Sequence, residues 1–260
     1  MNGKNDCVKE SCVKLEKLHK LFFELSSRER MSILMGLHDQ GLRLAKISRS
    51  LGLSPPEVSR HLQRLSEASL IQKDEDGMYQ LTSYGKLVLS QIPALVFISN
   101  HSEYFNEKDY SGIPYELIER MGELLEAEFD GETADSLNNI ELILNDAKDF
   151  IYFISNKIVT SLTPIIARKI GKSLDFKVIL PRRAIDAVIS DPLIPLGIQF
   201  RFLENVDALV IVTEGISAFG LPDKDGKFDY SGFKGKDLRL KKWCKDLFLY
   251  YWDKAKPAKF

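Results

Sequence analysis

The segment LGLSPPEVSRHLQRL, residues 51–65, carries side chains whose types and spacing suit contacts with nucleic acid. Its apolar residues Val58, Leu62 and Leu65 recur at helical spacing, so they must face a core. The opposite side of that helix then carries Glu57, Ser59, Arg60, Gln63 and Arg64. Arginine forks to guanine and glutamine to adenine in the major groove, while serine and arginine also hold phosphates. The segment therefore predicts a DNA-recognition helix.

Two adjacent prolines, Pro55 and Pro56, fix the start of this helix. Proline has its φ preset for a first helical turn and lacks an amide donor that has no partner there. Ser54 and Glu57 match the spacing of a capping box. Pro56 disfavours the α conformation at Pro55, which allows a start at Pro56 and an imperfect cap at Ser54.

The elements around this segment follow the order of a winged helix. Apolar spacing predicts helices over residues 13–25, 28–37, 42–51, 55–69 and 82–97. The sequence LIQKDEDGMYQLT predicts a hairpin about Asp76 and Gly77. Two helices joined by a short turn, then a hairpin and a helix, present the second helix to a major groove. We expect a bend at Pro93 in the last helix.

The recognition helix and its neighbours supply the expected DNA contacts. The expected base contacts are Arg60, Gln63 and Arg64, and the expected phosphate contacts are Lys46, Arg49, Ser59 and Lys73. The hairpin tip, Asp74-Glu75-Asp76, is acidic and repels phosphate. Either this wing stays away from the duplex, or only Lys73 and the nearby backbone reach it. A compact helical bundle with solvated basic residues gives the same pattern, and that alternative stays open.

The back of the chain alternates between strand and helix signals. Strands are predicted at residues 149–155, 175–180, 198–203, 207–213 and 217–222, and helices at 164–171, 182–190 and 236–254. This alternation predicts a mixed, partly parallel sheet with covering helices. The turn-rich segment 99–114 places the domain boundary in or before it. We therefore expect an α+β / α/β two-domain fold, with a winged helix-turn-helix domain at 1–97 and an α/β sensor or dimerisation domain at 98–260.

The composition indicates a cytoplasmic protein whose front is mildly basic. The 260 residues are 44% hydrophobic and 28% charged, which suits two modest soluble domains. Residues 1–95 hold 14 Lys+Arg and 11 Asp+Glu, a charge of +3, and residues 96–260 hold 22 and 26, a charge of −4. Cys7, Cys12 and Cys244 fit neither a disulfide framework nor zinc spacing, so we expect no metal and no cofactor. We expect no signal peptide and no membrane span, because no long apolar run occurs.

Longer stretches resemble known archaeal regulators. LAKISRSLGLSPPEVSRHLQRLSEASLIQKDEDGMYQLTSYGKLV is similar to the ArsR-like winged-helix domain of archaeal transcriptional regulators. DYSGIPYELIERMGEL and VTEGISAFGLPDKDGKFDY resemble the middle and C-terminal region of the archaeal methanogenesis regulatory protein family. The resemblance implies a one-component transcriptional regulator with a C-terminal sensing or dimerising domain. Methanogenesis itself does not follow from it.

Catalytic motifs are missing from the sequence, so we expect no enzyme and no catalytic residue. A phosphodiesterase-like site on such a sheet needs His-x-Lys with a following Asp. The histidines are His19, His38, His61 and His101, and none has Lys two residues on. A G-x-S-x-G motif, a glycine-rich phosphate loop and a paired metal motif are also absent. An unrecognised site in 140–260 is the open alternative.

The ends of three predicted strands carry polar residues that suit a small anionic effector. Ligands of open α/β sheets sit at the carboxyl ends of the strands. The expected ligand-binding residues are Ser155, Asn156, Arg182, Arg183, Thr213 and Glu214. Arg182 and Arg183 also open a helix, where free amides favour anions. Solvated loop residues give the same pattern, and both readings stay open.

The final helix has a broad apolar face made of Leu240, Trp243, Leu247, Phe248, Tyr251 and Trp252. This face covers either its own sheet or a partner subunit. The helix with Leu15, Leu18 and Phe22 is a second dimer candidate. We expect a homodimer, since winged-helix regulators gain affinity by spanning two half-sites.

The sequence therefore predicts a regulator that binds double-stranded DNA as a homodimer and answers to a small-molecule effector of unknown identity. The rival interpretation is a winged-helix module that docks on other proteins without binding DNA. The small positive charge of the front half and the acidic wing tip allow that rival.

Overall fold

The computed structural model describes residues 15–131, 133–159, 162–170, 174–190 and 197–257. The chain divides into two compact units, Met1–Ile92 and Pro93–Phe260. The division falls inside one helix, α5 (Ser83–Asn100), which also contains the boundary expected after residue 97. The segment with Cys7 and Cys12 lies outside the described residues. No helix in the described ranges is long and apolar enough to cross a membrane.

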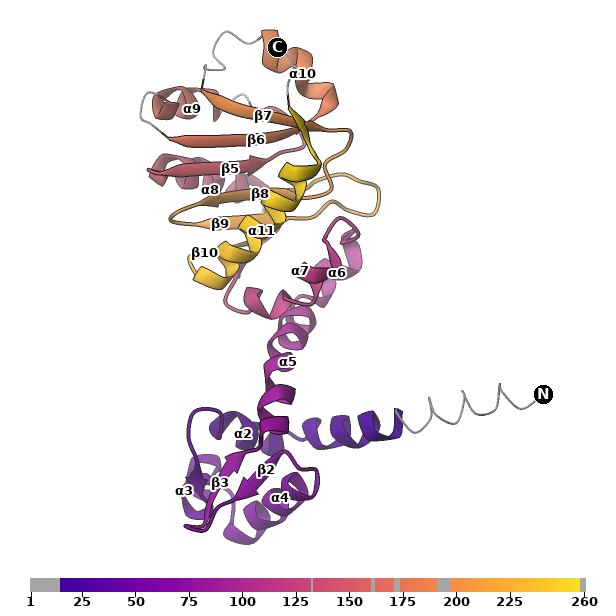
Figure 1. Ribbon diagram of the computed structural model, residues 1–260, viewed down its shortest axis with the longest axis vertical. Helices are drawn as coiled ribbons and strands as arrows, with labels where there is room; N and C mark the ends of the chain where they lie inside the picture. The colour runs from indigo at the N-terminus through magenta and orange to yellow at the C-terminus, as the bar shows by residue number, and fades with distance from the viewer. Residues whose placement is uncertain (1–14, 132, 160–161, 171–173, 191–196, 258–260) are drawn as a thin grey trace, which may run out of the picture. The chain divides into compact units, whose positions relative to one another are not determined.

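The first unit is a winged helix-turn-helix fold (Figure 1). Its helices are residues 15–25, α2 (Arg28–Gly36), α3 (Leu44–Leu51), α4 (Pro55–Glu67) and the start of α5. Its strands are β1 (Leu42–Arg43), β2 (Ile71–Lys73) and β3 (Met78–Leu81), paired antiparallel in the order β1-β3-β2. The hairpin expected about Asp76 and Gly77 is present as β2 and β3, and Gly77 has the positive φ of 80° that its turn requires.

The strand β1 replaces the start of a predicted helix. The sequence predicts helix from Leu42, but Leu42 pairs with Tyr79 of β3 and Arg43 has extended backbone angles, φ −81° and ψ 150°. Helix α3 begins only at Leu44. The prediction was wrong because a strand that is distant in the sequence, invisible to local periodicity, pairs with these two residues.

The core of the first unit fixes the orientation of α4. Val58, Leu62 and Leu65 are 0–1% exposed and pack with residues of α2 and α3 such as Leu34 and Ile47. Helix α5 comes so close to the turn between α4 and β2 that a Cβ added at Gly85 lies 2.0 Å from the Leu70 carbonyl oxygen. Only glycine fits at this crossing. One side of α4 is therefore locked inward, and the other is left at the surface.

The second unit is built on a mixed sheet. Its strands are β4 (Glu128–Asp130), β5 (Phe150–Ile154), β6 (Asp175–Pro181), β7 (Ile198–Leu203), β8 (Leu209–Thr213), β9 (Ser217–Gly220), β10 (Gly232–Gly235) and β11 (Lys256–Pro257). Its helices are α6 (Ser102–Glu107), α7 (Tyr115–Ile118), α8 (Thr133–Asp146), α9 (Thr163–Ile170), α10 (Ile185–Ser190) and α11 (Leu238–Lys254), with 3₁₀ turns at η1 (Met121–Leu124) and η3 (Arg182–Ala184). The sheet order in the described residues is β11-β7-β6-β5-β8-β9-β10-β4. Strands β5, β6 and β7 are parallel, and the other pairs are antiparallel. This confirms the expected two-domain α+β architecture; β4, β10, β11, α6, α7 and α8 were not predicted.

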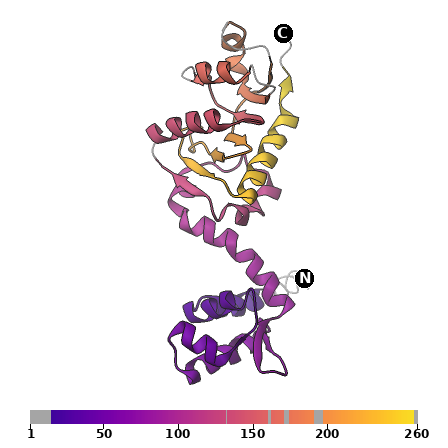
Figure 2. The ribbon, with the colours of Figure 1, turned by 90° about the vertical axis from the view of Figure 1, so that its left-hand side faces the viewer.

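Helices cover both faces of this sheet. Figure 2 shows α11 on one side and α8 on the other, and α9 and α10 pack on the α8 side. The broad apolar face of α11, including Trp243 and Phe248, is buried in its own unit, against residues such as Tyr152 and Phe219. Trp243 Nε1 also donates to the Leu117 carbonyl at 2.9 Å. The structure thus decides between the two open alternatives: the stripe covers its own sheet.

The segment 99–114 is more ordered than its polar sequence suggests. Helix α5 continues to Asn100 and α6 follows at once, so turns lie mainly at the end of this segment, at residues 111–113, and the division between the units lies before it. Tyr104 of α6 is buried and its hydroxyl accepts from the Leu221 N–H at 2.9 Å. The Lys108 side chain is 3% exposed, and its ammonium pairs with the Asp229 carboxylate at 2.5 Å. Contacts with distant residues hold this polar stretch in place.

Candidate functional site

The start of α4 is set by its prolines and its cap. The helix begins at Pro55, one residue before the start that steric conflict with Pro56 allowed. Glu57 Oε2 accepts from the Ser54 backbone N–H at 2.9 Å and from the Ser54 hydroxyl at 2.6 Å. These hydrogen bonds lower the pKa of Glu57 below its usual value. The preceding helix α3 ends at Gly52, whose φ of 67° turns the chain toward α4.

The outward face of α4 presents two of the three expected base-reading side chains to solvent. Arg60 and Gln63 are exposed, and so is Ser59, which directly precedes Arg60. Gln63 Nε2 donates to Glu67 Oε1 at 2.9 Å within the helix. Within the described part of the chain, Arg60 has no hydrogen bond or ion pair. This face therefore holds an unengaged guanidinium beside an amide, a pair of groups that can read guanine and adenine edges.

The third expected base reader, Arg64, is engaged inside its own unit. Its Nη2 and Nε lie 2.5 and 3.1 Å from the two carboxylate oxygens of Glu24, on the helix over residues 15–25. Glu24 also pairs with Arg30 at 2.9 Å, and Arg64 lies 4.9 Å from the Phe23 ring centroid. In this structure Arg64 ties α4 to the first helix instead of projecting freely.

The surroundings of the Glu24 carboxylate favour its charged form, which pairs with Arg64. Its side chain is 12% exposed, and Arg30 beside it is 9% exposed. The hydrogen bond from Arg64 lowers the pKa of Glu24, and the nearby Arg30 charge adds to that effect, while burial opposes it. Arg30 also donates to the backbone oxygens of Glu24 and Phe23, near the end of the first helix. Sequence reasoning missed this cluster because Glu24 and Arg64 are forty positions apart and no periodic pattern links them.

The expected phosphate contacts are all at the surface. Lys46 and Arg49 are exposed on α3, and Lys73 is exposed on β2 with its ammonium 5.6 Å from the Tyr79 ring centroid. Arg43 adds an exposed basic residue on β1, and sequence reasoning missed it because it expected helix there. These groups supply positive charge on the elements that flank α4.

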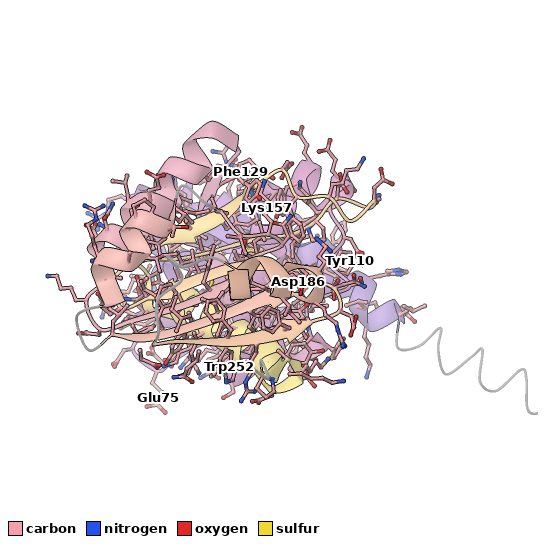
Figure 3. All side chains as sticks on the ribbon, turned by 90° about the horizontal axis from the view of Figure 1, so that it is seen from above. Glu75, Tyr110, Phe129, Lys157, Asp186 and Trp252 are labelled. Carbon is pink, nitrogen blue, oxygen red and sulfur yellow. The ribbon has the colours of Figure 1, made fainter. Side chains whose placement is uncertain are left out.

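One of the three carboxylates at the acidic tip of the wing stabilises the turn itself. Asp74 Oδ1 accepts from the Met78 backbone N–H at 2.8 Å and so closes the turn. Glu75, labelled in Figure 3, and Asp76 are exposed. The tip therefore keeps two solvated carboxylates, which oppose close approach of phosphate.

The expected ligand residues of the second unit fall into two groups. Ser155 and Asn156 follow β5, and Arg183 follows β6, so parallel pairing brings them to one edge. Arg183 Nη2 donates to the Asn156 carbonyl at 3.1 Å, and Tyr230 donates to Asn156 Oδ1 at 3.2 Å. Arg182 points elsewhere and forms an exposed pair with Glu204 at 2.9 Å.

Thr213 and Glu214 lie at the opposite edge of the sheet, which corrects the expectation of a single site. Strand β8 is antiparallel to β5, so Thr213 pairs with Ile151 at the start of β5. The Glu214 carboxylate accepts from the backbone N–H groups of Lys148 and Asp149, at 2.6 and 3.4 Å. Burial opposes ionisation of Glu214, but these N–H donors keep its pKa below the usual value. The sequence showed where strand β8 ends but not which way it runs.

One family model matches a segment of the first unit. The family described as a helix-turn-helix domain matches residues 25–73, from the end of the first helix to β2. Among solved structures, TrmBL2, an archaeal chromatin protein described as having a novel mode of DNA binding, is 17% identical over 86% of this chain and 92% of its own, with a TM-score of 0.45. HlyU from Vibrio cholerae N16961 is 24% identical over 32% of this chain and 94% of its own, with a TM-score of 0.29.

Another solved structure is similar to part of the chain. Nuc from Salmonella typhimurium, a phospholipase D family member, is 13% identical over 52% of this chain and 100% of its own, with a TM-score of 0.41. No curated protein sequence matches the chain. The chain thus contains a helix-turn-helix domain, defined by the family match and by the geometry of α3, the Gly52 turn and α4.

Proposed function

We propose that the protein is a sequence-specific DNA-binding transcriptional regulator that reads double-stranded DNA with α4. The observation that carries this proposal is the outward face of α4, where Arg60 is exposed and unengaged among the described residues while Val58, Leu62 and Leu65 are buried. Arg60 and Gln63 read bases. Ser59, Lys46, Arg49 and Lys73 bind phosphates, with Arg43 as an added contact.

The direct test uses a binding site selected from random DNA by the wild-type protein. Arg60→Ala should weaken binding to that site by about 1–3 kcal/mol, measured by fluorescence anisotropy, because it removes a base contact without touching the core. Arg182→Ala is the matched control, since it removes the same charge from an exposed ion pair of the second unit. If Arg60→Ala binds as tightly as wild type, the assignment of the face is wrong.

Salt dependence separates this proposal from the rival, a winged-helix module that docks on proteins. DNA binding releases counterions, so the logarithm of the binding constant must fall linearly with the logarithm of the salt concentration. Failure to select any DNA fragment at low salt favours the rival.

We further propose the organisation that the resemblance to archaeal ArsR-like and methanogenesis-type regulators implies. The protein acts in the cytoplasm as a homodimer whose second domain senses a small effector. Support for the dimer comes from the first helix, where Leu15, Leu18, Phe22 and Phe23 are 41–58% exposed. Phe22→Glu should convert the dimer to a monomer in light scattering and abolish tight binding to a two-half-site operator. A wild-type monomer overturns this part.

We also propose that the second unit is not an enzyme, since no histidine follows residue 101 and no His-x-Lys occurs in the chain.

A further inference from the structure

A cavity lies in the second unit on the face of the sheet that α9 and α10 cover. Its walls are mainly apolar and include Phe153, Ile166, Val178, Leu180, Val188 and Phe200. Its free volume is about 60 Å³. Because one water molecule needs about 10–15 Å³ of such free volume, the space fits about four to six non-hydrogen atoms. A cavity of this size and lining favours a short hydrocarbon chain over water.

Two lining residues are polar, Lys157 and Thr163. Lys157, labelled in Figure 3, follows β5, and its ammonium lies 5.2 Å from the Tyr230 ring centroid. Among the described residues, no carboxylate pairs with this ammonium. Lys157 is exposed and also lines this cavity, so its charge lies at the solvent-facing side of the apolar chamber. The cavity thus combines an apolar interior with one cation that has no anionic partner.

Further positive charge lies at the same edge of the sheet. Arg183 is held there by its hydrogen bond to the Asn156 carbonyl, one residue before Lys157. A second cavity on the other side of Phe153 differs in its electrostatics, because its carboxylate Asp130 already pairs with Lys234 at 2.9 Å and accepts from Asn139 at 2.5 Å. Of these two cavities in the described residues, the one that Lys157 lines is therefore the one with a cation left for a ligand's anionic group.

We propose that this cavity binds a short-chain aliphatic carboxylate, with the hydrocarbon tail between α9 and the sheet and the carboxylate on Lys157. An aliphatic amine is disfavoured because its charge repels Lys157, and a neutral alcohol of equal length leaves the ammonium without an ion pair. A charge-assisted hydrogen bond to Lys157 is stronger than a neutral one. The ligand's role as the effector rests on the proposed function, whereas its binding to the protein does not.

The test is calorimetric titration of the full chain with hexanoate, whose five-carbon tail matches the cavity. We expect one hexanoate per chain and a raised unfolding temperature. Acetate lacks the tail and 1-hexanol lacks the charge, so each should bind at least about tenfold more weakly, a difference of about 1.4 kcal/mol. Octanoate, whose tail exceeds the cavity, should also bind more weakly.

Two variants locate the site. Lys157→Met keeps the length of the side chain but removes its charge, and it should lower hexanoate affinity about tenfold. Lys224→Met, which removes an exposed lysine of the β9–β10 loop, is the control and should bind like wild type. Ile166→Phe adds volume on α9 and should abolish binding while the far-ultraviolet circular dichroism spectrum stays unchanged.

Specific outcomes overturn the proposal. It fails if wild type does not bind hexanoate, or if Lys157→Met and wild type bind it equally. It also fails if 1-hexanol binds as tightly as hexanoate. These measurements are made without DNA. A protein that binds hexanoate but no DNA would therefore contradict the proposed function and still support this site.

Discussion

The outward face of α4 and the carboxyl edge of the β5–β7 sheet were both predicted from short polar patterns. The structure brings the expected residues together on α4 but separates those of the sheet. On α4, the expected side chains Ser59, Arg60 and Gln63 do share one exposed face. In the sheet, Thr213 and Glu214 lie at the edge opposite Ser155 and Asn156. A few residues of sequence are enough to predict which side chains share one face of a helix. Whether a strand runs parallel or antiparallel depends on the strands that it pairs with.

Arg64 shows the limit of that rule even within a helix. Its position in the sequence put it on the α4 face, but Glu24 of another helix engages its guanidinium. Local periodicity therefore predicts the face on which a residue lies and leaves open what its side chain contacts there. The experiments below perturb the two regions in turn.

The largest effect is expected at Gly85, where the first unit leaves no room. Gly85→Ala puts a Cβ 2.0 Å from the Leu70 carbonyl oxygen, and the backbone movement that this forces should cost about 3 kcal/mol of unfolding free energy. Urea unfolding of the variant measures the loss. Gly36→Ala, whose nearest contact is Leu42 Cδ1 at 3.9 Å, is the control and should be neutral or slightly stabilising. Equal stability of both variants contradicts the close crossing of α5.

The next effect concerns the Glu24 cluster that engages Arg64. Glu24→Gln leaves the nearly buried Arg30 without its carboxylate and should cost about 2 kcal/mol. Because the folded-state pKa of Glu24 is lowered, its stabilisation is fully present above the unfolded pKa of about 4.3 and is lost as the pH falls through the folded value. Urea unfolding between about pH 6 and 3 should therefore show a shallower acid loss in the variant than in wild type. Parallel curves contradict the ion pair.

A double-mutant cycle separates the pairing of Arg64 from its packing. Glu24→Gln and Arg64→Met should show a coupling of about 1 kcal/mol in unfolding free energy. Arg64→Met should also weaken operator binding less than Arg60→Ala, since its guanidinium is held by Glu24. A larger loss at Arg64 shows that DNA releases it from Glu24 and that it reads a base.

The smallest effect is expected at Glu214, which lies at the other edge of the sheet from Ser155 because β8 is antiparallel to β5. Glu214→Gln weakens the hydrogen bonds from the N–H groups of Lys148 and Asp149 and should cost about 0.5–1 kcal/mol. Hexanoate affinity should not change, because Glu214 lies at the other edge of the sheet from Lys157. A large change in affinity contradicts the separation of the two edges.

Much of this fold could be predicted because its signals are local. The Asp76-Gly77 turn, the α4 core positions and the alternation of strands with helices each show within about ten to fifteen residues. Strands β1, β4 and β10 escaped prediction because each is short and stabilised by pairing: Arg43 pairs with Met78, and Phe233 pairs with both Phe129 and Phe219. The candidate DNA face was predictable for the same local reason, and the Glu24 cluster was not.

The sequence by itself determined that a proline-led helix buries Val58, Leu62 and Leu65 and turns Arg60 outward, because 3.6-residue periodicity and proline geometry act within one segment. Only the tertiary structure decided that Glu24 engages Arg64, that α11 covers its own sheet, and that β8 runs against β5. Those outcomes depend on contacts between segments far apart in the chain, where the gain from packing and pairing outweighs any local preference.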